Sequence, residues 1–267
     1  MTAQILAFLR RDYLLASTSR LALAWQIIAV GFAVPTLYYL GRLIYPAAIP
    51  SLRTAGADYF TFVVLGVSAG TFFSTMMGTC AAAVRGEQMG GTIETLLVMP
   101  ASPWAMAVGA SLWGTLIAAG QALFYLVLAS VIFPMHLANA NLLGVAAAVA
   151  FTIAAFVPLG MLSSAFVLVF RRPDVFTGTL ASISILLAGV FYPTTVMPPA
   201  LQRAAEFVPL THGLRALRLA AIRGDGPMAL RGELTALLAF FVVVFPAAML
   251  ACRLAFHEVR RSGGFNG

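Results

Sequence analysis

The sequence predicts an all-α polytopic membrane protein with six transmembrane helices, an amphipathic N-terminal helix at the membrane interface and a re-entrant helical hairpin before the last span. Of its 267 residues, 61% are apolar and 9% are charged, against roughly 45–50% and about 25% in an ordinary soluble domain. The mean hydropathy is +0.95. A spanning helix needs about 20 apolar residues, so residues 1–267 form one membrane domain. This composition excludes a soluble enzyme, a nucleic-acid-binding domain and a disordered chain.

The first 20 residues have the pattern of an amphipathic helix that lies along the membrane surface. Ile5, Phe8, Leu9 and Tyr13 recur at helical spacing, and the charged run at 10–12 interrupts the apolar side. The alternative is that these residues form the frayed start of the first span. They lack the cleavage-site pattern of a signal peptide.

Six long apolar runs predict the transmembrane spans. They cover approximately residues 21–43, 59–84, 104–133, 142–170, 175–192 and 234–254. Along the second run, small residues recur at every fourth position, at Gly66, Gly70, Ser74 and Gly78. Such a stripe lets another helix approach closely. We expect this packing partner to lie within the same subunit rather than in a second subunit.

The segment 85–103 is too polar for the membrane core and predicts a short helix between the second and third spans. Gly90 and Gly91 end the preceding helix, and Thr92 can cap a new one. Glu94 lies in its first turn, where a negative charge is favoured, and Pro100 ends it. The opposite side of this helix is apolar.

The segment 193–233 predicts two short helices before the last span. The first is expected at about 200–207, where Pro209 stops it, and the second at about 211–222 with Thr211 as its cap. Leucines and arginines lie on different sides of the second helix. The pattern fits a re-entrant hairpin, in which proline breaks are tolerated where protein or water satisfies the backbone. The alternative is a plain extracellular loop with a surface helix.

The sequence lacks the residue patterns that are typical of ion pathways, nucleotide binding, metal binding and catalysis. No ionisable residue lies near the centre of a predicted span, where a proton or ion pathway would need one. The chain contains no lysine and therefore no glycine-rich phosphate-binding loop. His136, His212 and His257 are far apart, and Cys80 and Cys252 lie in apolar runs without a disulfide or metal-ligand spacing. We therefore expect no catalytic residue, cofactor or metal site, and any uphill transport would need another subunit to supply the energy.

The net charge of +7 comes from 16 arginines and nine acidic residues. In a chain this apolar, we expect the arginines to meet anionic lipid and not nucleic acid. If both termini are cytoplasmic, nine arginines lie inside and seven outside. The positive-inside rule favours this orientation only by that small margin.

Two segments resemble the permease subunit of a type-2 ATP-binding-cassette (ABC) exporter, the ABC-2 transporter family. Residues 87–100 (EQMGGTIETLLVMP) are similar to the family pattern of spaced Glu, Gly-Thr, Glu, Leu and Pro after the second span. Residues 189–218 (GVFYPTTVMPPALQRAAEFVPLTHGLRALR) resemble its aromatic-Pro turn, Pro-rich step and Pro-Leu-Thr before a basic helix. Tyr192 stands where many members have phenylalanine. With the six-span layout, the resemblance extends over nearly the whole chain.

The resemblance implies two permease copies, as a homodimer or a heterodimer, and two separate ABC ATPase subunits that bind ATP and Mg. It implies that the helix at 92–99 couples ATP hydrolysis to transport, with coupling residues Arg85, Glu87, Thr92, Glu94, Leu96 and Leu97. It implies an extracellular re-entrant outer gate at 193–233, with gate residues Tyr192, Pro193, Pro198, Pro199, Pro209, Thr211, Arg215 and Arg218. The expected location is the plasma membrane, the inner membrane of a bacterium.

The resemblance predicts export of an amphipathic or lipid-like substrate, such as a drug, a glycolipid or a lipid-linked polysaccharide. Phenylalanine, tyrosine and methionine are frequent in the spans, but ordinary lipid-facing and packing roles account for them equally well. Two other functions stay open: a membrane-embedded enzyme that acts on lipids, and an assembly subunit without a transport path of its own.

Overall fold

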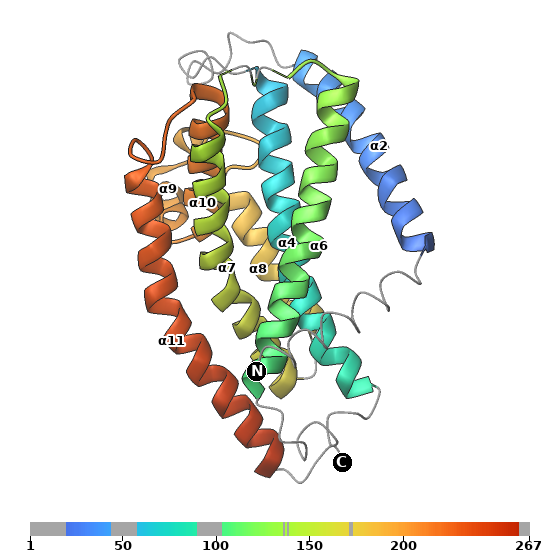
Figure 1. Cartoon of the computed structure of the whole chain (residues 1–267), viewed down its shortest axis with the longest axis vertical. Helices are drawn as coiled ribbons and strands as arrows, with labels where there is room; N and C mark the ends of the chain where they lie inside the picture. Colours follow the sequence, from blue (N-terminus) through green and yellow to red (C-terminus); the bar gives the residue numbers. More distant parts are fainter. Residues whose placement is uncertain are drawn as a thin grey trace.

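The computed structural model describes residues 20–43, 58–89, 103–135, 137, 139–170 and 173–261 (Figure 1). All regular secondary structure in these ranges is helical. The long helices are α2 (Arg20–Leu43), α4 (Tyr59–Met89), α6 (Pro103–Ile132), α7 (Leu142–Phe170), α8 (Pro173–Leu187) and α11 (Arg231–Arg261). The short ones are η2 (Thr194–Val196), α9 (Pro199–Ala205), α10 (Pro209–Arg218) and η3 (Leu219–Arg223). The predicted interface helix at 1–20 lies almost entirely outside the described residues.

Among the residues that the structure describes, four helices contain stretches that are long and apolar enough to cross a membrane. These stretches are Tyr59–Gly86, Gly114–Ile132, Leu142–Phe170 and Arg231–Ala255. The first and fifth expected spans, α2 and α8, are not among them. The six-span topology therefore stays a prediction, while the all-helical fold with several membrane-spanning helices is confirmed.

The fifth expected span is shorter than predicted. Helix α8 ends at Leu187 instead of continuing to residue 192. Its 15 residues span about 22 Å at 1.5 Å per residue, less than the ~30 Å hydrocarbon layer. The reason is Gly189, whose φ of +68° turns the chain out of the helix.

Helix α4 is the centre of the bundle. Of its apolar stretch, 72% is buried, against 17% for the stretches in α6 and α11. The largest core cluster forms where α4 meets α7, and Phe73 and Phe156 pack there with ring centroids 4.7 Å apart. Helix α2 lies at the edge of the bundle (Figure 1), where Tyr38 stacks on Phe133. Helix α4 therefore joins the surrounding helices α6, α7, α8 and α10 into one bundle.

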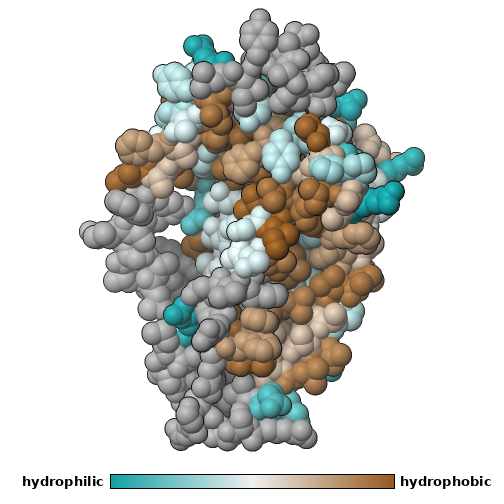
Figure 2. All heavy atoms as spheres, turned by 180° about the vertical axis from the view of Figure 1, so that it is seen from behind, coloured by the Kyte–Doolittle hydropathy of each residue, from teal (hydrophilic) through white to brown (hydrophobic). Residues whose placement is uncertain are grey.

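The outer surface of the bundle is largely apolar. Figure 2 shows one face on which hydrophobic side chains cover most of the middle of the described surface. Many large apolar side chains are exposed, including Phe32, Val131 and Val243 at 72–77%. Because such a surface is unfavourable in water, the middle of the bundle is suited to lipid.

The short helices α9 and α10 lie at the end of the bundle where α11 begins (Figure 1). Their position is fixed partly by the start of α7. Asn141 accepts a hydrogen bond from the Gly144 amide, as an N-cap residue does, and its own amide donates to the Ala220 carbonyl. A Cβ at Gly144 would lie 2.3 Å from the carbonyl oxygen of Asp225. Glycine at this position therefore allows the loop after η3 to dock on α7.

Candidate functional site

The segment 189–223 forms the candidate site, and its proline positions determine where its helices begin. Pro199 and Pro209 are the first residues of α9 and α10, a position that proline favours. The two expected short helices are present. Thr211, however, does not cap α10, because the cap residue is Val208 and Thr211 lies in the first turn. The Thr211 hydroxyl is buried and has no hydrogen-bond partner among the described residues.

Helix α10 has two chemically different faces. Leu210, Leu214 and Leu217 recur at helical spacing on one face, while Thr211, Arg215 and Arg218 recur in the same way on another. The leucine face packs against α4 and α7, and Leu210 and Leu214 are almost fully buried. The polar face carries the charged groups of the site.

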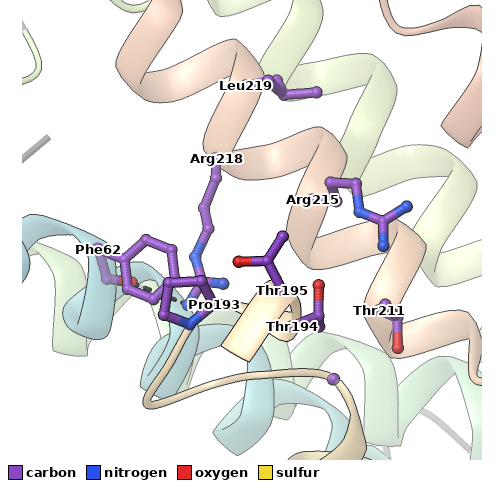
Figure 3. Close-up of a pocket in the computed structure, with 9 residues that line it drawn as sticks. Phe62, Pro193, Thr194, Thr195, Thr211, Arg215, Arg218 and Leu219 are labelled. Carbon is purple, nitrogen blue, oxygen red and sulfur yellow. Dashed lines mark hydrogen bonds between the residues drawn. The ribbon is translucent and has the colours of Figure 1, made fainter. Parts of the chain in front are cut away.

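Arg218 joins α10 to α4 and to the turn after α8. Its Nη1 donates to the Gly189 carbonyl at 3.0 Å, and its Nη2 donates to the carbonyls of Val190 at 2.9 Å and Phe62 at 3.1 Å. The guanidinium also lies 3.4 Å from the centre of the Phe62 ring, a cation–π contact (Figure 3). Burial lowers the pKa of Arg218, while the carbonyls and the ring stabilise the protonated form. Its Nε is buried without an acceptor among the described residues.

Gly66 makes this contact possible. A Cβ at residue 66 would lie 2.3 Å from the Val190 carbonyl oxygen and 2.6 Å from Nη2 of Arg218. Further along the stripe, Gly70 faces Ile185 at ordinary contact distance and Ser74 is half-buried. Gly78 is exposed, and a Cβ there would meet nothing within 4 Å. The stripe thus packs within this chain at Gly66 and Gly70, whereas Gly78 has no packing partner among the described residues.

An ion-pair network connects α9, α10 and α11 beside Arg218. Arg215 pairs with Glu206 at 2.8 Å and with Glu233 at 3.2 Å. The two ring nitrogens of His212 face the Glu233 carboxylate and, at 3.0 Å, the Glu206 carbonyl. Because both neighbours are acceptors, this geometry suits the protonated imidazolium. The hydrogen bond to Glu233 is the main cause that raises the pKa of His212, and burial opposes it.

Two cavities flank α10. The Arg218 cavity, of about 180 Å³, lies on its polar face and is shown in Figure 3. It is lined by Phe62, Ala188, Pro193, Thr194, Thr195, Thr211, Arg215, Arg218 and Leu219. The apolar cavity, of about 340 Å³, lies among α4, α6, α7 and the leucine face of α10. Ser68 and Thr152 are the polar residues in its otherwise apolar lining.

Comparison with known families identifies the chain. The model of the ABC-2 type transporter family matches residues 3–221. The chain belongs to the ABC-2 type transporter family. No curated protein matches it. As an ABC-2 permease it is a multi-pass membrane component of an ABC transporter, and this family generally works with an ABC ATPase subunit.

The structure places only part of the expected coupling segment of this ABC-2 permease. Arg85 and Glu87 lie in the last turn and a half of α4, which continues past the predicted span to Met89, directly before Gly90 and Gly91 in the sequence. Arg85 is exposed. The other expected coupling residues, Thr92, Glu94, Leu96 and Leu97, lie outside the described residues.

The expected outer-gate residues of the permease all lie in one region. Arg218, Thr211, Arg215 and Pro193 line the same cavity, and the Tyr192 hydroxyl donates to the Leu186 carbonyl at 3.1 Å. Pro198 is the cap of α9, and the remaining two prolines begin α9 and α10 as described above. This arrangement forms a compact cap at one end of the bundle.

The partners of Arg215 and Arg218 were not predicted from the sequence. Glu206 and Glu233 are 27 positions apart and meet only because α11 starts beside α10. Phe62 is distant in sequence from Arg218 and looks like an ordinary core residue. A signal for the first pair was present, since the segment 193–233 mixes arginines with a few acidic residues. No signal pointed to Phe62.

Proposed function

We propose that this chain is the permease of an ATP-driven exporter that moves an amphipathic or lipid-like substrate outward across the plasma membrane, which is the inner membrane in a bacterium. Two permease copies, identical or paired with a related chain, form the path, and two separate ATPase subunits bind ATP and Mg. The observation that carries this proposal is the family match over residues 3–221.

The apolar cavity supports an amphipathic substrate. It lies at the depth of the membrane-spanning helices α4, α6 and α7, and exposed Leu123 and Val149 are among its lining residues. Pockets that bind drug-sized molecules are mainly apolar with a few polar groups. A hydrocarbon portion of a substrate matches this lining, whereas a sugar chain without a lipid does not.

In this proposal, α9 and α10 act as the outer gate and the segment 85–103 as the coupling element. Arg218 supports the gate role, because it connects the cap to the central helix α4 and to the turn after α8. Movement of α4 would therefore change the position of the cap. Arg85 is exposed at the far end of α4.

Reconstitution tests the function directly. The permease and its ATPase, in sealed vesicles, should move fluorescent amphipathic compounds across the membrane only when ATP is present on the ATPase side. At least one compound of a panel should also stimulate ATP hydrolysis. A matched complex with a hydrolysis-deficient ATPase is the control. Substrate movement that continues without the ATPase, or chemical conversion of a lipid by the permease alone, would contradict the proposal.

A further inference from the structure

The apolar cavity lies where four helices meet without filling the space between them. Helix α6 packs mainly on α4 and only slightly on α7, so space remains between α6 and α7. Each of the four helices contributes a partly exposed side chain to the lining: Ala69 (α4), Ala122 (α6), Val145 (α7) and Leu217 (α10). The wall that a ligand can reach is therefore made of apolar side chains from all four helices.

The lining offers no free hydrogen-bonding side chain. Its polar side chains are Ser68 and Thr152, and each hydroxyl donates to a carbonyl of its own helix. Ser68 donates to Leu65 at 2.9 Å, and Thr152 donates to Ala148 at 2.6 Å. No charged residue is among the described residues of the lining. Apolar cavities of this kind stay dry, so the cavity is suited to hydrocarbon and not to water or an ion.

The size and shape of the cavity fit a hydrocarbon chain. Its lining extends over residues 119–126 of α6 and 145–152 of α7, two turns of each helix or about 10 Å. This long direction follows the spanning helices, as the chains of membrane lipids do. The volume of about 340 Å³ is more than twice that of a protein cavity that binds benzene, about 150 Å³. Because an unfilled apolar cavity is unfavourable in proportion to its volume, occupation by a chain would stabilise the fold.

The cavity is open to the bilayer. Leu123 and Val149 are among its lining residues and are 62% and 40% exposed, and both belong to apolar stretches that can cross a membrane. Small residues keep the opening wide, since Ala119 and Ala122 lie one turn apart on the same wall. The lining positions lie in the halves of α6 and α7 that are nearer the cap. A chain can therefore reach the cavity from the leaflet on the cap side.

We propose that the apolar cavity binds one hydrocarbon chain of a bilayer amphiphile, which enters sideways between α6 and α7 from the leaflet on the cap side. This inference rests on the proposed export function and deepens it, because it makes the cavity the place where the chain of the cargo lies. The leucine face of α10 forms one wall of the cavity. A bound chain therefore contacts the helix that we assign to the outer gate.

Photo-crosslinking tests chain binding without transport. The full-length permease, without its ATPase, is placed in nanodiscs that contain phosphatidylcholine with a diazirine in one acyl chain, and crosslinked residues are identified by mass spectrometry. We expect this lipid to label Leu217 and Ala69 inside the cavity as well as the exposed Leu123. Adamantyl diazirine, a compact apolar reagent, is the parallel probe. Labelling of Leu217 by that reagent but not by the lipid would overturn the assignment to a chain.

The principal variant is Ala122→Phe, which fills the cavity from α6. It should abolish labelling of Leu217, while labelling of the lipid-facing Val131, 77% exposed, continues. Ala119→Leu, one turn away on the same helix, is a milder second plug and should also lower the labelling of Leu217. Ala150→Phe is the matched control, because residue 150 is exposed on α7 and does not line the cavity, so labelling should be unchanged.

The outcomes separate this site from the export function. Labelling of Leu217 that a plug removes supports the proposal. Absence of labelling in the unmodified protein, whether the cavity stays empty or a second copy covers it, overturns the proposal. Labelling that both plugs leave unchanged, or that Ala150→Phe removes equally, also overturns it. Normal labelling without ATP-dependent transport would count against export alone, and transport without labelling would count against this site alone.

Discussion

At the scale of single residues, Arg218 illustrates how a charge can be held away from water without a counter-ion. A buried guanidinium is costly unless its donors find acceptors, and here three carbonyls and one aromatic face meet that need. All of them come from segments distant from α10 in sequence. The contact therefore stabilises the tertiary arrangement of the cap and not the helix α10 itself.

Replacing Arg218 by lysine tests this anchoring role. An ammonium group keeps the charge but cannot reproduce the planar arrangement of several donors. We expect Arg218→Lys to lower the free energy of unfolding by about 1–3 kcal/mol, measured by thermal unfolding in detergent. Arg203→Lys, at an exposed position on α9, is the control and should have no effect. Equal stability of both variants would contradict the anchor.

The glycine stripe on α4 allows a matched pair of substitutions. Gly66→Ala would place a methyl group against the Val190 carbonyl, and overpacking of this kind costs about 1–3 kcal/mol. Gly78→Ala meets nothing within 4 Å and should stabilise the helix by up to about 1 kcal/mol. Opposite shifts in unfolding temperature are expected. Destabilisation of the monomeric permease by Gly78→Ala, or tolerance of Gly66→Ala, would contradict the packing of α4 described above.

At the scale of elements, the ion-pair network fixes the start of α11 to α9 and α10. His212, Arg215, Glu206 and Glu233 bring three helices together at one point. His212 loses its charge when the pH rises, and a single substitution can remove Arg215 from the network. The docking of the cap is thus more sensitive to conditions than the apolar core beneath it.

The docking of α10 on α11 should depend on pH through His212. The pKa of this histidine is raised in the folded protein, so its contribution to stability is complete below the ordinary value of about 6.5 and is lost as the pH rises through the folded pKa. We expect the unfolding temperature to fall over that interval, and His212→Gln to remove the dependence. His257→Gln, at an exposed position near the end of α11, should retain it. A pH profile that His212→Gln leaves unchanged would assign the effect to another group.

At the scale of the whole molecule, the sequence predicted helix content and order well and helix ends less well. Long apolar runs place α4, α6, α7 and α11 because lipid requires about 20 apolar residues in each. The end of α8 was missed, since an apolar run continues past Leu187 and only the positive φ of Gly189 shows where the helix stops. The contacts of Arg218 could not be predicted, because they join segments that only the packing of α4 brings together.

The coupling of the permease to its ATPase is tested at Glu94. In the first turn of the helix predicted at 92–99, a carboxylate would contribute only about 0.3–1 kcal/mol through the helix dipole, so Glu94→Ala should not affect folding. As an ion-pair partner of the ATPase, its loss would leave an opposite charge unpaired, which costs about 2–5 kcal/mol at an interface. We expect ATP-dependent transport to fall steeply while membrane insertion stays normal. Normal transport by Glu94→Ala would move the coupling role to another residue.

The orientation of the molecule in the membrane can be read from the two ends of α11. Its 31 residues extend about 46 Å at 1.5 Å per residue, which is more than the ~30 Å hydrocarbon layer. Met228, 83% exposed just before this helix, lies beside the cap, and exposed His257 lies near the opposite end. With cytoplasmic termini, an impermeant thiol reagent added to intact cells should label Met228→Cys and spare His257→Cys, in a background where Cys80 and Cys252 are alanine. Permeabilised cells should show labelling at both positions, which establishes that each cysteine is reactive. The reverse pattern in intact cells would place the cap on the cytoplasmic side, where it could not act as the outer gate of an exporter.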